Sequence, residues 1–172
     1  MSASIDTSQD YIFAAVRAFL LGVLPSGVEV VKANDNSVPM PSGPFVSMMP
    51  GRMERLSTNI QQYTDLGTNP GTKGVMTPTK ISVQLDFYGA HSQDYAIITG
   101  NLFRDDYAIG AFPPDVTPLY AHDPVQMPLV TGEETYLQRW KMDIYLHINP
   151  VVSVSQDFFD TAHVDVIATD TL

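Results

Sequence analysis

The first apolar stretch of the chain has helical spacing. Within residues 7–24, apolar residues recur at intervals of three and four and form one face: Ile12, Val16, Phe19, Leu20 and Val23. Thr7 stands before this face and Asp10 follows three residues later, as in a capping box. A Pro-Ser-Gly sequence at 25–27 ends the stretch. We therefore predict a helix over residues 7–24 with Thr7 as its cap, followed by a short strand at 28–31.

Three later stretches alternate between apolar and polar residues, which is the pattern of half-buried strands. In residues 80–88 the apolar side consists of Ile81, Val83, Leu85 and Phe87. In residues 136–148, the strongest of the three, it consists of Trp140, Met142, Ile144, Leu146 and Ile148. Residues 161–169 alternate in the same way, and an Asn-Pro pair at 149–150 separates them from the second stretch. These patterns predict three strands, and they place Trp140 in the hydrophobic core.

The remaining segments are a second helix, one short strand and several loops. Ser92 is predicted to cap a helix through residue 104, with one apolar face: Tyr95, Ile98 and Leu102. Residues 45–49 read as a strand, and Pro50 fits a continuation to residue 56 only at a sheet edge or a bulge. Residues 34–44 and 112–128 are punctuated by prolines and are predicted loops.

The most polar and least periodic stretch covers residues 57–78 and contains Gly67, Gly71 and Gly74. Loops of this length inside a compact domain are uncommon and are usually functional or disordered. We expect a flexible excursion from the domain, in the form of a long extended loop or a hairpin.

The order helix, strands, helix, strands predicts an α+β fold. We expect a single domain over residues 1–172, with a mainly antiparallel sheet and two helices packed on one face. The chain has no internal repeat and no interdomain linker.

Composition adds three constraints on the kind of protein. Charged residues make up 16% of the chain, below the roughly 25% of an average globular protein, so part of the surface is expected to be covered by partner subunits. The net charge of −10 argues against a protein that grips nucleic acid through its phosphates. The absence of cysteine excludes disulfides and thiolate chemistry. Because the sequence shows neither a basic leader nor a long apolar stretch, we expect a soluble protein made in the cytoplasm.

The histidines and the paired acidic residues of the chain do not form a catalytic motif. The four histidines, His91, His122, His147 and His163, lack metal-ligand spacing, and we expect neither a metal nor a cofactor. Acidic pairs stand at Asp105–Asp106 and Glu133–Glu134. Paired carboxylates serve glycosidases, so a hydrolase using Asp105 or Asp106 is kept as an alternative, although adjacent carboxylates on a loop usually face water.

Several short motifs together resemble the phage neck terminator proteins. They come in the family's order over nearly the whole chain: Arg17-Ala18-Phe19-Leu20, Gly43-Pro44-Phe45-Val46, Asp86-Phe87-Tyr88-Gly89, Pro118-Leu119-Tyr120-Ala121, Arg139-Trp140, Asn149-Pro150-Val151-Val152 and Gln156-Asp157-Phe158-Phe159. No one motif is diagnostic, but their order and spacing together are fairly specific. The resemblance implies a structural virion protein without enzymatic residues, which agrees with the absence of a catalytic motif in the sequence.

The resemblance also implies partners and a location. Such proteins form a ring, usually sixfold, that caps the last ring of the tail tube and joins it to the head connector or collar, with the sheath as a further partner. DNA passes through without specific binding, and the protein resides in the virion after assembly in the host cytoplasm, away from membranes. Acidic residues are candidates to line the channel: Asp65, Asp105, Asp106, Glu133 and Glu134. The alternative within this class is another ring-forming component, a tube or baseplate subunit.

Overall fold

The computed structural model describes residues 3–33, 40–67, 70–127, 129–130 and 136–159. Its helices are α1 (Gln9–Val23), α2 (Ser92–Phe103) and α3 (Asp106–Ala111). Its strands are β1 (Ser4–Ile5), β2 (Glu29–Lys32), β3 (Phe45–Arg55), β4 (Ile60–Thr64), β5 (Gly71–Met76), β6 (Thr79–Tyr88), β7 (Val116–Ala121), β8 (Val125–Gln126), β9 (Leu129–Val130), β10 (Tyr136–Leu137), β11 (Arg139–Ile148) and β12 (Val151–Gln156). The fold is α+β with mostly antiparallel sheets, as the sequence predicts.

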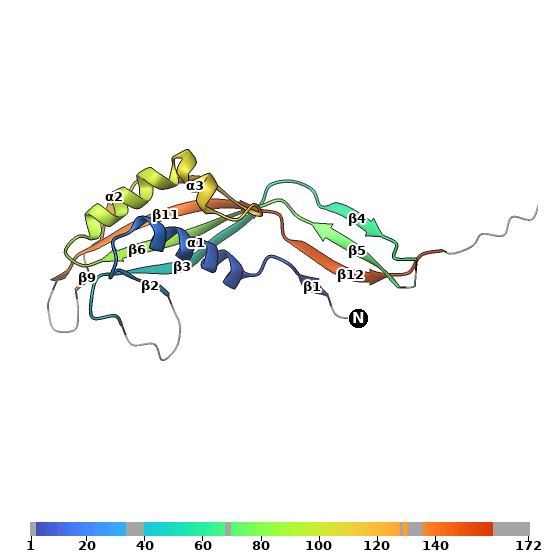
Figure 1. Ribbon diagram of the computed structural model, residues 1–172, viewed down its shortest axis with the longest axis horizontal. Helices are drawn as coiled ribbons and strands as arrows, with labels where there is room; N and C mark the ends of the chain where they lie inside the picture. The colour runs from blue at the N-terminus through green and yellow to red at the C-terminus, as the bar shows by residue number, and fades with distance from the viewer. Residues whose placement is uncertain (1–2, 34–39, 68–69, 128, 131–135, 160–172) are drawn as a thin grey trace, which may run out of the picture.

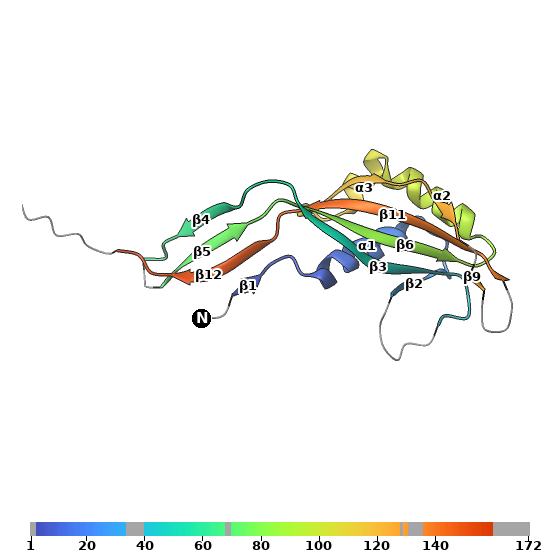
Figure 2. The ribbon, with the colours of Figure 1, turned by 180° about the vertical axis from the view of Figure 1, so that it is seen from behind.

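A six-stranded sheet forms the body of the molecule. Its strand order is β2-β3-β6-β11-β7, and β8 pairs with the start of β11. The β2–β3 pair is parallel and the other pairs are antiparallel. The three helices lie over one face of this sheet (Figure 1), and seen from behind the strands pass in front of α1 (Figure 2). The sheet therefore has one covered and one uncovered face.

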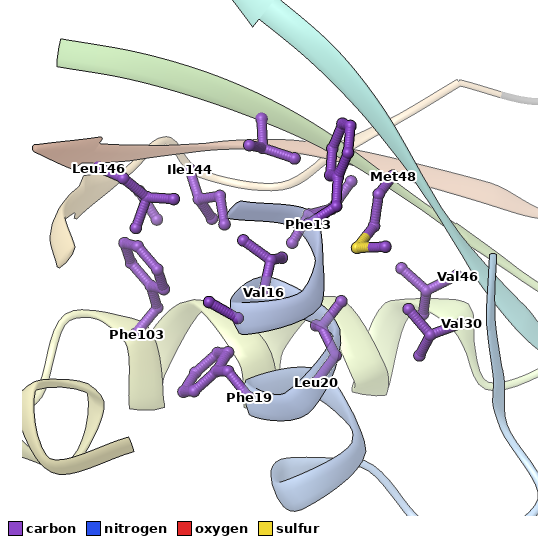
Figure 3. Packing of buried hydrophobic residues seen from close by; sticks show 14 of the residues in the cluster. Phe13, Val16, Phe19, Leu20, Val30, Val46, Met48, Phe103, Ile144 and Leu146 are labelled. Carbon is purple, nitrogen blue, oxygen red and sulfur yellow. The ribbon is translucent and has the colours of Figure 1, made fainter. Parts of the chain in front are cut away.

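The hydrophobic core fills the space between the covered face and the helices. Helix α1 contributes Phe13, Val16, Phe19 and Leu20 to this core, Phe103 comes from α2, and Phe19 lies against Phe103 (Figure 3). The predicted apolar sides of β6 and β11 supply the sheet's part of the core. On β6, the apolar residues at every second position from Ile81 to Phe87 are each exposed by 5% or less, and on β11 those from Met142 to Ile148 are each exposed by 1% or less. Trp140 differs from this prediction because it is partly buried and packs against the margin of the core.

A second, four-stranded sheet, here called the arm, extends away from the body (Figure 1). Its strand order is β1-β12-β5-β4, and every pair is antiparallel. Two long strands of the body continue into it, since β5 leads into β6 past Pro78 and β11 leads into β12 past Pro150. The predicted excursion at residues 57–78 thus contains the β4–β5 hairpin, and its flexibility stays a prediction.

The structure corrects the predicted start of each helix. Ser8, not Thr7, caps α1, since its hydroxyl accepts a hydrogen bond from the Tyr11 amide, whereas the Thr7 hydroxyl donates to Asp6. Ser92 lies inside α2 as a buried first residue, and His91 precedes it without a capping bond. The buried face of α2 also differs from the predicted apolar face. Small and polar residues such as Thr99 and Gly100 are buried, whereas Ile98 and Leu102 are half-buried.

Several elements were not predicted. Residues 112–128 were predicted as loop, yet they contain β7 and β8, and α3 precedes them. Strand β12 follows the Asn-Pro pair directly. The strand predicted at 161–169 lies outside the described residues. Of the helices described, none is long and apolar enough to cross a membrane.

Candidate assembly interface

The uncovered face of the body sheet is the first candidate contact surface. Along β11 the side chains facing away from the helices are half-exposed, while those between them are buried. An antiparallel sheet with one packed face and one open face shows this alternation. Along β11 this open face is therefore available to water or to another subunit, whereas Phe45, Asp86 and Tyr88 at its end distant from the arm are buried.

At the end of this face that is distant from the arm, three of the sequence motifs meet on adjacent strands. The register aligns Phe45 of β3 with Tyr88 of β6, and Tyr88 with Arg139 of β11. The Phe45 and Tyr88 rings stack with centroids 4.4 Å apart, and the Arg139 guanidinium carbon lies 5.8 Å from the Tyr88 centroid. Burial raises the pKa of the Tyr88 hydroxyl, although Arg139 acts in the opposite direction. Phe45 is 5% and Tyr88 is 9% exposed, so this row packs within the end of the sheet, and the separate sequence motifs do not predict that its members meet.

Asp86 anchors this end of the sheet from within. Its side chain is 2% exposed and accepts from two nitrogens of Arg139, Nε at 3.2 Å and Nη2 at 3.0 Å. Gln84 Nε2 donates to its other carboxylate oxygen at 2.9 Å. A buried charge is tolerated when it is paired and hydrogen-bonded in this way. The pair therefore has a structural role in joining β6 to β11.

Nearer the arm, the open face becomes a patch of aromatic and charged side chains. Tyr120 stacks on Tyr145 with centroids 4.4 Å apart, and the His122 ring lies 4.9 Å from Tyr145. Lys80 forms an ion pair with Glu54 at 3.1 Å beside them. Burial is the main cause that raises the pKa of the Tyr145 hydroxyl. Tyrosines in a partly hydrated, charged setting are typical of protein–protein contact surfaces.

The arm is the second candidate contact surface because it exposes apolar residues without a covering layer. Every residue of β4 is exposed, including Ile60 at 50% and Tyr63 at 53%, and Leu66 in the following turn is 61% exposed. The Lys73 ammonium lies 5.4 Å from the Tyr63 centroid. Exposed apolar groups on so small a sheet favour an interaction site.

We predict that the β4–β5 hairpin opens easily in the free subunit and becomes protected in the assembly. A thin sheet with one hydrogen-bonded layer and few buried contacts has a low free energy of local opening. Hydrogen exchange measured by mass spectrometry should show fast exchange for residues 60–76 in the isolated chain and slower exchange once copies assemble. The β6–β11 pair serves as the internal reference. Equal, strong protection of both segments in the free chain would contradict the prediction.

A bulge in β3 marks the junction between body and arm. Pro50 pairs with Val83 and Met53 pairs with Ile81, so Gly51 and Arg52 together face one residue, Ser82. A side chain at position 51 would collide with Ser82, which explains the glycine, and the Arg52 amide donates to the Ser82 hydroxyl at 2.8 Å. The strand thus continues past Pro50 by means of the bulge.

Beside this bulge lies an apolar groove of about 520 Å³. One wall comes from β1 and the first turn of α1, and the other from the bulged part of β3 and the neighbouring ends of β6 and β11. No sequence pattern predicts this groove, because its lining comes from segments that are distant along the chain.

Of the predicted channel residues, the described ones lie in two separate parts of the molecule. Asp65 lies in the β4–β5 turn, where its carboxylate accepts from the Gly67 amide at 2.8 Å. Asp105 and Asp106 begin α3 on the helical layer of the body. Glu133 and Glu134 lie outside the described residues. Whether any of these carboxylates faces a channel stays a prediction.

The acidic pair at Asp105–Asp106 has a local role in the structure. The Asp105 carboxylate accepts from the Tyr107 amide at 3.0 Å and caps α3. That hydrogen bond lowers the pKa of Asp105, and its side chain in turn raises the pKa of Asp106. Within the described residues, no group of three or more His, Asp or Glu side chains is placed to hold a metal ion.

The half-exposed face of the body sheet and the projecting arm give the molecule two surfaces suited to contact with other proteins. The model of the phage neck terminator protein family matches residues 10–170, and the chain belongs to this family. It is accordingly a structural component of the phage tail, in a family of tail terminators and not of enzymes. Among curated proteins, none matches the sequence significantly.

The fold is similar to that of a solved structure. It is the cryo-EM structure of an extracellular contractile injection system, the PVC sheath/tube terminator in its extended state. The similarity has a TM-score of 0.55 at 13% sequence identity, and it covers 96% of this chain and 65% of that chain. This protein therefore spans somewhat less than two thirds of the length of the chain that it resembles.

Proposed function

We propose that this protein forms a closed ring, of six copies, at the neck of a tailed phage. There it ends the growth of the tail tube and presents a surface to the head connector or collar. The family supports the terminating role, and the similar injection-system terminator supports the tube and the sheath as neighbours. The protein assembles in the host cytoplasm and remains in the virion.

The projecting arm is the observation that supports the proposed ring most strongly. A body with an arm at one end is asymmetric, so an arm that docks on the next body makes a heterologous contact, and such contacts close into rings when the rotation permits. The exposed apolar residues of β4 and its turn suit such a contact. A tube or baseplate subunit would also form rings, but tube subunits stack, whereas a terminator stops at one ring.

Tube growth in the presence of this protein tests the proposal. Purified tube protein is polymerised with and without the chain, and lengths are measured by electron microscopy. Wild-type protein should shorten the tubes and leave one ring at an end, whereas Ile60→Asp combined with Leu66→Asp should not. Ile109→Asp, at a 67%-exposed site on α3, is the matched control and should behave as wild type. Tubes of unchanged length with every variant would overturn the proposal.

We further predict that the bore of the ring is acidic or neutral and lets DNA slide. Nine Lys and Arg against nineteen Asp and Glu leave few cations to line a channel. A cationic bore would hold phosphates and release them only at higher salt, whereas an acidic wall repels the duplex. Assembled rings should show no measurable binding to duplex DNA at low salt. Tight binding that weakens steeply with salt would reveal a basic track and contradict the prediction.

A further inference from the structure

The bulged half of β3 has an open edge. Strand β2 pairs with β3 from Phe45 to Met48, and β6 pairs with β3 along its other side as far as Arg55. From Met49 to Arg55, no strand among the described residues occupies the side that β2 leaves free. Proteins usually cover or block such an edge, because its backbone groups can pair with another strand.

The open edge borders the apolar groove. Pro50 and Met53 of β3 line it opposite Ile5 of β1 and Phe13 of α1. Met53 is 65% exposed and Ile5 is 55% exposed, so the groove is not filled by the side chains around it. A strand added to β3 here would place every second side chain over apolar surface.

The charge at this edge favours an acidic occupant. Seven of the nine Lys and Arg side chains contact a carboxylate, a carbonyl or an aromatic ring, and those that do not are Arg52 and Arg55. Neither has an ion pair with another described residue. The β3–β6 register puts Arg52 on the open face, opposite Ser82, and Arg55 on the groove side, opposite Thr79. Two guanidiniums without an ion-pair partner among the described residues thus flank the edge in a chain of net charge −10.

The chain itself contains a segment with the required chemistry. Residues 160–172 carry three aspartates and no Lys or Arg, and apolar residues occupy every second position at Val164, Val166 and Ala168, with Ile167 as a further apolar residue between the last two. This segment begins at the far end of the arm, where Phe158 packs against Gly71 and Phe159 is fully exposed. Its extended length of up to about 45 Å allows it to reach well beyond the arm.

We propose that residues 161–169 of one copy add a strand to the open β3 edge of the neighbouring copy. Val164, Val166 and Ala168 then cover the groove, and Asp165, on the other side of the added strand, faces Arg52. Backbone pairing supplies affinity and the alternating side chains supply register, as in other strand-addition complexes. This inference rests on the proposed ring, in which each copy contributes one segment and receives another.

Engineered cysteines test the contact directly, because the chain has none of its own. Met53→Cys and Val166→Cys are placed in one full-length chain, which is assembled on tube ends and oxidised. We expect disulfide-linked ladders of two or more copies on denaturing gels. Ile109→Cys with Val166→Cys is the matched control and should remain monomeric. Arg52→Asp in the test chain should reduce the ladder about tenfold by like-charge repulsion, and adding Asp165→Arg should restore it.

Each outcome has a separate meaning. Rings that form without a cross-link overturn this inference and leave the proposed ring standing. A cross-link confined to single chains means that the segment folds back on its own groove, which also overturns it. If neither the cysteine variants nor the wild-type chain forms rings or caps tubes, the proposed function is overturned together with this inference.

Discussion

Replacing Arg139 with alanine should lower the free energy of unfolding by about 3–5 kcal/mol, because it leaves the Asp86 carboxylate buried without its cation. Asp86 accepts from two guanidinium nitrogens in a position that water scarcely reaches. Gln84 alone cannot replace that charge. Chemical denaturation of the purified variant, followed by circular dichroism, measures the loss.

Two further variants make this prediction specific. Arg55→Ala removes an exposed arginine that has no ion pair among the described residues, so its effect should stay within about 0.5 kcal/mol. Asp86→Leu combined with Arg139→Met replaces the pair by apolar groups and should recover most of the stability. If Arg139→Ala alone were as stable as Arg55→Ala, the buried pair would have no structural role.

Phe19→Ala should destabilise the protein by a similar amount, about 3–5 kcal/mol, because it opens a cavity at the centre of the core. Phe19 is 2% exposed, and its ring lies 5.7 Å from that of Phe103 and 5.2 Å from that of Phe112. These three rings join α1 to α2 and to the end of α3, so the loss affects the whole helical layer.

Trp140→Ala is the informative comparison for Phe19→Ala. The sequence pattern places Trp140 in the core, but the structure places it half-buried at the core margin. Thermal unfolding should therefore show a clearly smaller decrease for Trp140→Ala than for Phe19→Ala. The reverse order would mean that the core is centred on the strand end and not beneath α1.

The elements predicted best are those whose pattern is set by a single buried face. Helix α1 and strands β6 and β11 each pack one side against the core, so their periods of 3.6 and 2 are visible in the sequence. Strand β7 was missed because Pro118 argues against a central strand. The structure shows how a strand accommodates this proline, since β7 is the edge of its sheet and its register shifts beside Pro118.

The arm and the open face could not be predicted for a different reason. Strand β4 is exposed along its whole length, so no alternation reveals it. Asp86 has the appearance of a solvent-facing residue in its strand, and its burial depends on Arg139, 53 positions away. Surfaces that are completed by distant segments or by other copies leave little local pattern, and the candidate interface consists mostly of such surfaces.

The central claim is that this chain closes into one ring at the end of the tail, and cryo-EM of tail tubes capped by the purified protein tests it most directly. We predict one layer of density at one end of each tube, with sixfold symmetry, and with the arm of each copy resting on the next body. Repeated layers along the tube would identify a tube subunit instead. Single unringed copies, or no density at the tube ends, would contradict the account.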